Sequence, residues 1–412
     1  MTANKTLGIV ADDLTGAMDS SGYFASQGFT TNVIIDSDFY SPADVLAINT
    51  NSRVDDINTA NRKVRRAIRT LAGRMIYKKI DSTLRGNIGA ELEAAMEELA
   101  SEKAIVAPAF PSLGRITING VLQVDGTRVD ETQFADDPVS PIKESHIPTL
   151  LEQSTKRFVG CLPLEAINAG PELLYRKISE MPEEIIVCDV TAQSHLTNIA
   201  QAAALASGHW LLCGSGGLAR EMPIFLRKAT KGRKGRPISS LSGPVLMVVG
   251  TRNRVAVNQL LRVRDEIDLP ILKVESVKPD DVSSRWVQQI VGEASRLLRQ
   301  NRLLVLSSAF SDYVPTIKQL LPTIMAEMVA GILDNQEVAG LFLSGGDTAL
   351  SVCRRLSTCA ILIHGEIEPG IPAGELVGGR GQGIRVITKA GGFGTETVLI
   401  KSIPYLEEGF LT

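Results

Sequence analysis

Residues 9–19 have the sequence IVADDLTGAMD, and this stretch indicates the fold class. The apolar run 7–10 stops at two adjacent carboxylates, Asp12 and Asp13, and a helix-forming stretch follows. The pattern predicts a strand, a tight turn and a helix. One aspartate is an ordinary helix N-cap, but a cap needs only one carboxylate and adjacent like charges repel. Because ligands of open α/β sheets lie beyond the carboxyl ends of the strands, both aspartates are candidate binding residues.

Short apolar runs alternate with amphipathic stretches over most of the 412 residues. Such alternation predicts an α/β fold with two domains, each a largely parallel or mixed sheet flanked by helices. We expect strands at residues 7–10, 32–35, 45–48, 75–80, 104–106, 185–188, 210–213, 245–249, 303–306, 340–343 and 385–387. Residues 228–244 are basic and rich in Gly, Ser and Pro, as exposed linkers are. We therefore predict domains at 1–230 and 244–412, joined by a linker at 231–243, with the active site in the cleft between them.

Composition excludes several classes of protein. Hydrophobic residues make up 44% and charged residues 22%, which is typical of globular proteins, and the net charge of −3 argues against nucleic acid and anionic membranes as partners. We find no signal peptide and no apolar run long enough to span a bilayer. The five cysteines form no CxxC pair and the four histidines have no metal-ligand spacing. We therefore expect buried thiols and a cytoplasmic location, and we leave a homo-oligomer open.

Polar residues also follow the other strands expected in the first half. Asn51 and Arg53 follow one strand, and the stretch Lys79, Ile80, Asp81, Ser82, Thr83, Leu84, Arg85 follows another. If these strands are neighbours of the first in a parallel sheet, their ends converge on Asp12 and Asp13. An arginine can grip a carboxylate through two hydrogen bonds, while Asp and Asn accept from sugar hydroxyls. The set suits a small, hydroxylated anion. The alternative for Lys79, Asp81 and Arg85 is a surface salt-bridge cluster at a helix start.

Glycine clusters distinguish the second half. They comprise residues 250–253 (Gly-Thr-Arg-Asn), 344–348 (Ser-Gly-Gly-Asp-Thr) and 389–394 (Lys-Ala-Gly-Gly-Phe-Gly), and a further one at 214–219 precedes the linker. Glycine lets backbone N–H groups approach a phosphate, and a helix N-terminus favours the anion. None of the clusters is a Walker A loop or a GxGxxG fingerprint. A single Gly-Gly turn is usually an ordinary connection, but three such loops in one domain favour nucleotide binding.

Several motifs together resemble the four-carbon acid sugar kinase family. They are ADDLTGAMD at 11–19, KIDSTLRGN at 79–87, PAFPSLGR at 108–115, LQVDG at 122–126, SGGDTA at 344–349, EIEPGIP at 366–372 and KAGGFG at 389–394. They occur in order over nearly the whole chain. The resemblance implies an N-terminal domain that binds the acid sugar and a C-terminal domain that binds ATP.

The resemblance also implies site residues. For the substrate they are Asp12, Arg53, Asp81, Ser82, Thr83, Leu84 and Arg85, and we add Asp13 and Asn51 from the strand ends described above. For ATP they are Thr251, Gly345, Gly346, Asp347, Thr348, Gly391, Gly392 and Gly394, and we add Ser215 from the glycine cluster at 214–219. The family usually has Gly-Ser-x-Ser where this chain has Gly-Thr-Arg-Asn at 250–253, so Thr251 keeps a hydroxyl and Asn253 replaces the second serine.

The resulting hypothesis is an ATP- and Mg²⁺-dependent kinase that phosphorylates the terminal hydroxyl of threonate, erythronate or an oxo-tetronate. We expect Arg53, with Arg85 assisting, to hold the substrate carboxylate. Asp12 is the first choice for the base and Asp81 the second, and Lys79 neutralises developing charge. Mg²⁺ bridges the phosphates, and its protein ligands are not assigned. Which stereoisomer is used is left open.

Three other functions compete with this hypothesis. A sugar-acid sensor would keep the first site and lack the second. A sugar-acid isomerase or dehydratase would use the paired carboxylates to abstract a proton. A phosphatase of the haloacid-dehalogenase type would need Asp-x-Asp after the strand, whereas Asp12 and Asp13 are adjacent.

Overall fold

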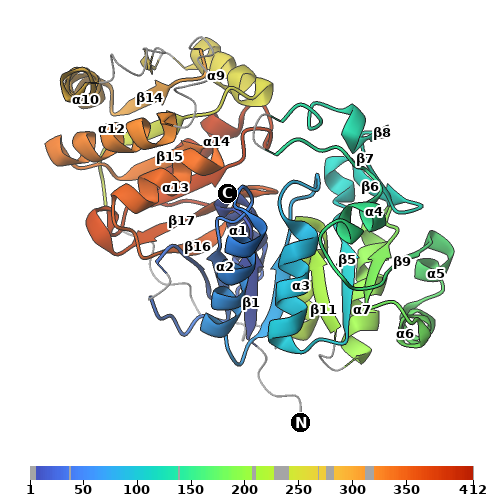
Figure 1. Ribbon diagram of the computed structural model, residues 1–412. Coiled ribbons are helices and arrows are strands. Elements are labelled where there is room, and N and C mark those ends of the chain that lie inside the picture. The colour runs from blue at the N-terminus through green and yellow to red at the C-terminus, as the bar shows by residue number, and fades with distance from the viewer. Residues whose placement is uncertain are drawn as a thin grey trace. The chain divides into compact units, whose positions relative to one another are not determined.

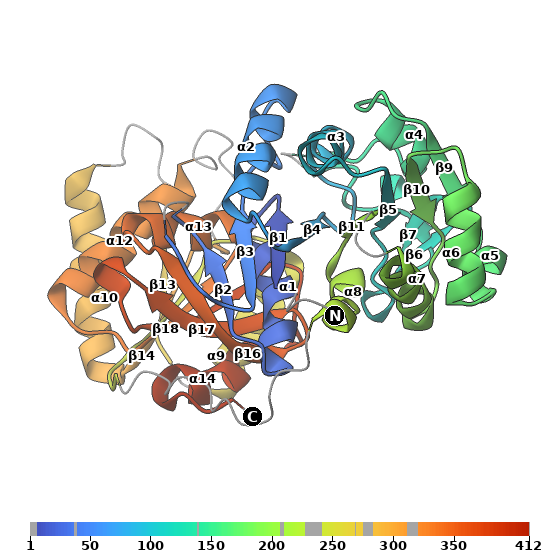
Figure 2. The same cartoon turned by 90° about the horizontal axis from the view of Figure 1, so that it is seen from below.

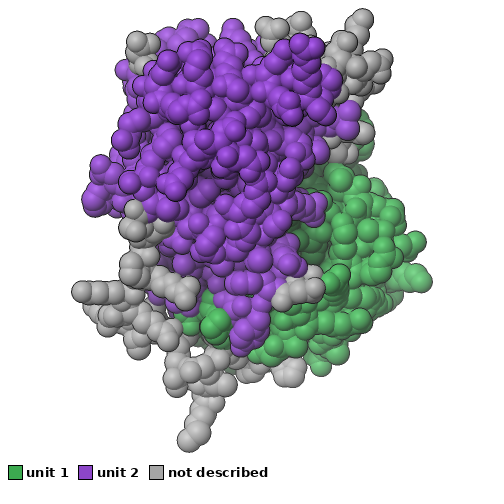
Figure 3. Space-filling view, turned by 90° about the vertical axis from the view of Figure 1, so that its left-hand side faces the viewer, with its two compact units in different colours: residues 1–20, 42–230 green, residues 21–41, 231–412 purple. Residues whose placement is uncertain are grey.

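A computed structural model describes the chain except for residues 1–5, 37–38, 138–139, 207–209, 227–240, 268, 275–282, 311–319 and 412. By its internal contacts the chain forms two compact units. Unit 1 comprises Met1–Ser20 and Pro42–Thr230, and unit 2 comprises Ser21–Ser41 and Lys231–Thr412 (Figure 3). The second unit therefore contains a short N-terminal segment that the predicted domains had placed in the first. Most of the predicted linker, residues 231–240, lies outside the described residues.

Unit 1 is built on a parallel sheet with the strand order β3-β1-β4-β11-β5-β10-β9. These strands are β1 (Leu7–Ala11), β3 (Val45–Asn49), β4 (Met75–Lys79), β5 (Lys103–Ala107), β9 (Val159–Leu162), β10 (Ile185–Cys188) and β11 (Trp210–Gly214). A small antiparallel sheet holds β6 (Arg115–Ile118), β7 (Val121–Val124) and β8 (Thr127–Arg128). The helices are α1 (Leu14–Ser26), which continues into unit 2, α2 (Ile57–Thr70), α3 (Ile88–Leu99), α4 (Ile147–Glu152), α5 (Leu164–Asn168), α6 (Pro171–Glu180), α7 (Gln193–Leu205) and α8 (Gly216–Ala219).

Local sequence explains why these helices form where they do. In α2 the Asp56 side chain accepts a hydrogen bond from the Thr59 N–H, so the helix begins with a side-chain cap. Its buried residues Ala60, Val64, Ala67 and Ile68 recur at the three- to four-residue spacing of one helix face. That face packs in the interior of unit 1, while the opposite face is charged.

Unit 2 has a mixed sheet. Its strand order is β13-β14-β12-β15-β18-β17-β16-β2, parallel from β13 to β18 and antiparallel from β18 to β2. The strands are β2 (Thr31–Ile34), β12 (Val245–Val249), β13 (Ile271–Lys273), β14 (Leu303–Ser307), β15 (Gly340–Ser344), β16 (Ala360–Glu368), β17 (Ile371–Val377) and β18 (Arg385–Lys389). The helices are α9 (Arg254–Glu266), α10 (Ser284–Asn301), α12 (Leu321–Asn335), α13 (Gly346–Arg355) and α14 (Val398–Glu408).

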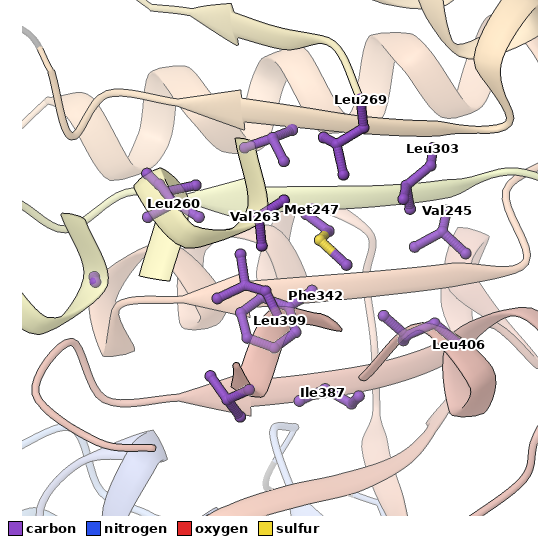
Figure 4. Packing of buried hydrophobic residues seen from close by; sticks show 14 of the residues in the cluster. Val245, Met247, Leu260, Val263, Leu269, Leu303, Phe342, Ile387, Leu399 and Leu406 are labelled. Carbon is purple, nitrogen blue, oxygen red and sulfur yellow. The ribbon is translucent and has the colours of Figure 1, made fainter. Parts of the chain in front are cut away.

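The core of unit 2 lies between the sheet and two of its helices. Met247, Phe342 and Ile387 are aligned across β12, β15 and β18 and point to the side of the sheet that α9 and α14 cover (Figure 4). Leu260 of α9 and Leu399 of α14 pack against them. Helices α10, α12 and α13 pack together on the other side (Figures 1 and 2). Burying each large apolar side chain contributes about 1.5–3 kcal/mol, so this packing holds the strand ends in place.

The predicted α/β class, with helices flanking a parallel or mixed sheet in each half, is therefore confirmed. Within the described ranges, no helix is long and apolar enough to cross a membrane.

Candidate functional site

The carboxyl ends of three neighbouring strands meet at one edge of the sheet in unit 1. Ala11 is in register with Asn49 of β3 and with Lys79 of β4. The loops that follow these strands therefore start side by side. They contain the residues that the sequence singled out, 12–13, 50–53 and 80–85, and the structure brings them together.

Arg53 lies at the centre of a set of charged side chains that we call the Arg53 group, which comprises Arg53, Asp12, Asp13 and Asp81. Its Nε is 2.7 Å from Asp12 Oδ2, and its Nη2 is 3.0 Å from Asp13 Oδ1 and 3.4 Å from Asp81 Oδ1. Three carboxylates therefore surround one largely buried guanidinium, which offsets the repulsion among them. Burial by itself would lower the pKa of Arg53, but the three aspartates raise it well above its usual value. No described residue accepts a hydrogen bond from Nη1.

Asp12 is fully occupied by Arg53. Its two oxygens accept hydrogen bonds from Nε at 2.7 Å and Nη2 at 3.2 Å, and its side chain is 4% exposed. Burial favours the neutral acid, but Arg53, with Lys78 and Lys79, holds the pKa of Asp12 below its usual value. Gly86 packs against it with a φ of +102°, and a Cβ there would lie 3.1 Å from Asp12 Oδ2. Asp12 is therefore a fixed anion.

Asp81 is held in a similar way. It accepts hydrogen bonds from the Thr83 N–H at 3.1 Å, the Thr83 hydroxyl and Arg85 Nε at 3.0 Å. Although burial favours the neutral acid, Arg85 and Arg53 hold the pKa of Asp81 well below its usual value. Arg85 also contacts Asp137 at 3.4 Å and lies over the ring of Phe134. The turn between Asp81 and Arg85 has a positive φ of +67° at Leu84.

Asp13 differs from the other two carboxylates. Its Oδ1 accepts the Gly16 N–H at 2.8 Å at the start of α1, and its side chain is 22% exposed, against 10% for Asp81. Burial is the largest influence on its pKa, and the charges of Asp12 and Asp81 add to it. Together they outweigh Arg53 and Lys79 and raise the pKa of Asp13 above 3.8. Asp13 is thus the carboxylate of the group that most readily takes up a proton.

The other predicted substrate residues surround this group. Lys79 is buried and its Nζ donates to the Ile80 carbonyl at 3.0 Å. Asn51 has a positive φ of +48°, and its carbonyl accepts from Lys63 Nζ at 3.0 Å. Ser82 and Thr83 are buried in the same turn as Asp81.

A buried polar network beneath the site was not predicted from the sequence. Lys78 Nζ lies 2.7 Å from Glu91 Oε2 of α3, and both side chains are almost completely inaccessible. The Ser52 hydroxyl donates to Glu91 Oε1 at 2.5 Å and is 2.7 Å from the Thr50 hydroxyl. The network ties the loop that carries Arg53 to β4 and α3. Its signal in the sequence was Lys78, which together with Lys79 interrupts the apolar run of residues 75–80.

In unit 2 the glycine clusters also meet at the ends of aligned strands. Val249, Ser344 and Lys389 are in register across β12, β15 and β18. A Cβ on Gly391 would lie 2.6 Å from Thr251 Oγ1, and one on Gly250 would lie 2.0 Å from Thr348 Oγ1. The loops therefore approach so closely that only glycine fits at these two positions.

The predicted nucleotide residues of unit 2 are thereby brought together. Gly345 (φ +110°), Gly346, the exposed Asp347 and the buried Thr348 lie at the start of α13. A Cβ on Gly392 would lie 3.5 Å from Asn253 Nδ2. The Gly394 carbonyl accepts a hydrogen bond from Gln259 Nε2 at 3.1 Å.

Asn253, the departure from the family pattern, caps α9. Its Oδ1 accepts the Val255 N–H at 2.9 Å, and its own N–H donates to Thr251 Oγ1 at 3.2 Å. Asparagine and serine are both good N-caps, so the substitution preserves the local structure of this loop.

Ser215 belongs to unit 1, whereas these glycine loops belong to unit 2. Its hydroxyl donates to the Ala109 carbonyl at 3.0 Å and accepts the Gly217 N–H at 3.2 Å. Both roles of the hydroxyl are therefore used within unit 1, and the assignment of Ser215 to the nucleotide stays a prediction.

No group of three or more His, Cys, Asp or Glu side chains that could hold a metal occurs in the described part of the chain. The cysteines are free thiols, and Cys188, Cys213 and Cys353 are buried.

Named relatives match nearly the full length of the chain. A D-threonate kinase of Salmonella typhimurium is 33% identical, with 97% of this chain and 98% of the relative covered. A D-erythronate kinase of Heliobacterium modesticaldum is 27% identical (97% and 96% covered), as is a 3-oxo-tetronate kinase of Pseudomonas savastanoi pv. phaseolicola (98% and 98%).

Solved structures share the fold. A Salmonella typhimurium protein named as a putative tRNA synthase superposes with a TM-score of 0.82 at 21% identity, covering 96% of this chain and 98% of that one. A Haemophilus influenzae protein superposes with a TM-score of 0.75 at 22% identity, covering 97% and 100%. At these identities the likeness concerns the fold alone.

Family models match both halves of the chain. Residues 7–222 match a sugar-binding N-terminal domain, and residues 246–399 match a nucleotide-binding C-terminal domain. The first match contains the Arg53 group and the second contains the glycine loops. With the near-complete coverage of the relatives, these matches confirm the predicted resemblance: the chain belongs to the four-carbon acid sugar kinase family.

Proposed function

We propose that the protein is a kinase that transfers a phosphoryl group from ATP to the terminal hydroxyl of a four-carbon sugar acid. The observation that carries this proposal is the Arg53 group, a set of charged side chains suited to a small hydroxylated acid, in a chain whose relatives are kinases of threonate, erythronate and 3-oxo-tetronate. The glycine loops of unit 2 supply the nucleotide half of the proposal. A cytoplasmic location and the absence of nucleic-acid and membrane partners stay predictions.

Arg53 has donors left for the substrate carboxylate. Its Nε and Nη2 are bound to aspartates, whereas Nη1 faces no acceptor among the described residues. Guanidinium groups bind carboxylates strongly through their N–H donors. We therefore assign the Nη1 edge of Arg53 to the substrate carboxylate. The three aspartates hold the guanidinium in position before the substrate arrives.

The base is better assigned to Asp13 than to Asp12 or Asp81. Asp12 is bound through both oxygens, and Asp81 is bound by Thr83 and Arg85, so a proton on either would break strong hydrogen bonds. Asp13 has the raised pKa and the greatest exposure of the three. A general base works best when its pKa approaches the operating pH. Asp13 would accept the proton of the substrate hydroxyl, and Lys79, close by, would offset the negative charge.

Positioning and charge neutralisation account for most of the catalysis of phosphoryl transfer. In unit 2 the backbone N–H groups at the start of α13 and the close-packed glycine loops would bind the phosphates. Mg²⁺, when bound, would neutralise part of the phosphate charge, and no described residue is assigned as its ligand. The reaction requires the substrate of unit 1 and the phosphates bound by unit 2 to meet during turnover.

The test is ADP release from Mg²⁺-ATP with D- and L-threonate, D- and L-erythronate and 3-oxo-tetronate as acceptors. We expect turnover with one or a few of these acids. The Arg53→Ala variant should raise KM for the acid at least tenfold, whereas the control Arg69→Ala, on the exposed face of α2, should leave KM unchanged. Turnover of none of the acids would contradict the proposed acceptor. Lack of ATP binding as well would favour a sugar-acid sensor, and conversion of an acid without ATP would favour an isomerase or dehydratase.

A further inference from the structure

Lys389, the last residue of β18, has a buried amine without an acidic partner. Its side chain is 1% exposed, and its Nζ donates to the carbonyls of Ala390 at 2.9 Å and Gly391 at 3.0 Å. Burial is costly for an ammonium group and lowers the pKa of Lys389 to about 7. The two carbonyls use two of its three donors. The third donor has no partner among the described residues, so the group lacks a counter-ion.

Charged side chains near this edge of the sheet do not compensate Lys389. They lie at the start of α9, on α13 and around the last glycine loop, and they are Arg252, Arg254, Asp347, Glu368, Glu396 and Lys401. Burial alone, and no charge on a described residue, shifts the pKa of Lys389. Glu368, a nearby acid, is instead bound to Thr395 and Lys401.

A second buried group beside Lys389 also lacks a partner. Ser344 is in register with Lys389, so both side chains leave the sheet on the same face at the same level. The Ser344 hydroxyl is buried, and no described residue forms a hydrogen bond with it. Buried hydroxyls are usually paired, and an unpaired one indicates a missing ligand or water.

The start of α13 adds a third feature that favours an anion. Gly345 precedes the helix, its N–H donates to the Lys389 carbonyl at 3.0 Å, and no side chain caps the first turn. The ten-residue helix therefore directs its positive end to the place where Lys389 and Ser344 lie. The amine of Lys389, the unpaired hydroxyl of Ser344 and the uncapped N–H groups of α13 are all groups that an anion would pair with.

We propose that Lys389 is a phosphate-binding residue for the nucleotide in unit 2. This inference rests on the proposed kinase function and names a residue for it. In the free protein the amine is held by the carbonyls of its own loop. When the nucleotide binds, the amine turns to the phosphates, takes up a proton from solvent if it was neutral, and pairs with their negative charge. The Ser344 hydroxyl donates to the same group.

The test is calorimetric titration of the full-length protein with Mg²⁺-ATP at pH 8, in two buffers of different ionisation enthalpy. At this pH the phosphates are already ionised, whereas Lys389, with a pKa of about 7, is mostly neutral. We expect wild-type protein to take up about one proton per nucleotide bound. Lys389→Arg, which is always charged, should bind ATP without proton uptake.

Removal of the charge gives a second readout. Lys389→Met should weaken ATP and ADP at least tenfold and leave adenosine binding unchanged, because adenosine has no phosphate. Lys273→Met is a matched control, since Lys273 also ends a strand of this sheet but is exposed, and its ATP affinity should equal that of wild type.

The outcomes separate this inference from the proposed function. Binding of ATP by wild type without proton uptake, together with wild-type affinity in Lys389→Met, would overturn the role of Lys389 even if the protein phosphorylates a tetronate. Proton uptake without turnover of any tetronate would support Lys389 and contradict the proposed acceptor. Failure of wild type to bind ATP would overturn both. If Lys389→Met does not fold, the wild-type uptake and the Lys389→Arg variant decide the matter.

Discussion

Asp12 and Asp13 are adjacent in the chain, but their surroundings give them opposite acid strengths. Arg53 binds both oxygens of Asp12 and only one of Asp13, and Asp13 is also the more exposed. The pKa of Asp12 is accordingly lowered, while that of Asp13 is raised. One carboxylate fixes the arginine, and its neighbour is left to exchange a proton.

Exchange of the two aspartates for asparagine should therefore have different effects. Asp13→Asn should lower kcat about 10²- to 10⁴-fold with little change in KM, because a general base typically contributes that much. Asp12→Asn should mainly raise KM for the acid, because Arg53 loses a charged partner and its position. Steady-state kinetics with the best acid of the panel measures both.

The pH profile of wild type provides the control for this assignment. Because Asp13 must be ionised to act as a base and its pKa is raised, kcat should fall in acid with a midpoint above 3.8. Equal losses of kcat in both variants, or a profile that Asp13→Asn leaves unchanged in shape, would contradict Asp13 as the base.

At the scale of the element, the buried network of Lys78, Glu91 and Ser52 joins β4, α3 and the loop that follows β3. Removing one partner of a buried charged pair is strongly destabilising, because the other charge is left buried and unpaired. Replacing both partners with apolar side chains is often neutral. We therefore expect the network to serve mainly to position the loop that carries Arg53, because apolar side chains could give the same stability.

Removing one charged partner from this network should destabilise the folded protein far more than removing both. Glu91→Gln should lower the free energy of unfolding by about 3–5 kcal/mol, because Lys78 would be left as an unpaired buried cation. Adding Lys78→Met should restore much of that loss. Urea unfolding measures both, and a double variant less stable than Glu91→Gln would contradict the argument.

Local sequence was sufficient to predict several elements and the residues at their ends. The run 7–10 before Asp12 and the run 245–249 before Gly250 correspond to β1 and β12, because a short apolar run that stops at polar residues has few other structures available. The order β3-β1-β4 could be assumed but not predicted from the sequence, because packing between distant residues decides which strands are neighbours in a sheet.

Other features could not be predicted because their partners are remote in the chain. Glu91 looks like an ordinary helical residue until Lys78 is placed under it. Likewise, nothing local shows that residues 31–34 pair with β16, so the predicted domain 1–230 included them while the observed unit 2 contains them.

At the scale of the whole molecule, Lys389 should make stability depend on pH. Its folded pKa of about 7 lies below its ordinary value of 10.5, so between these values the unfolded chain binds the extra proton. Stability should therefore rise with pH from about 7 towards 10, and the penalty should be complete below 7. Thermal unfolding of nucleotide-free wild type and Lys389→Met at pH 6.5 and 9 tests this. The variant should be relatively more stable at pH 6.5, and an equal difference at both pH values would contradict it.

The composition of unit 2 predicts how fragments should behave. A fragment of residues 244–412 lacks β2, so the edge of β16 that β2 normally pairs with would be open. Open edges promote association between chains. We expect this fragment to aggregate when expressed alone, and to be improved by fusion of residues 21–41. Light scattering at matched concentrations measures the difference, and equally monodisperse fragments would argue against a structural role for β2.

The pairing of β2 with β16 also determines when unit 2 can finish folding during synthesis of the chain. The ribosome releases Thr31–Ile34 more than 300 residues before Ala360–Ile363, the strand segment with which it pairs. At about 5–20 residues per second, this delay lasts roughly 15 s to 1 min. During that time unit 1 can fold, while β16, the strand with which β2 pairs, has not yet been made. Unit 2 thus includes a segment that is made early, residues 21–41, and it cannot be completed until nearly the whole chain has been translated.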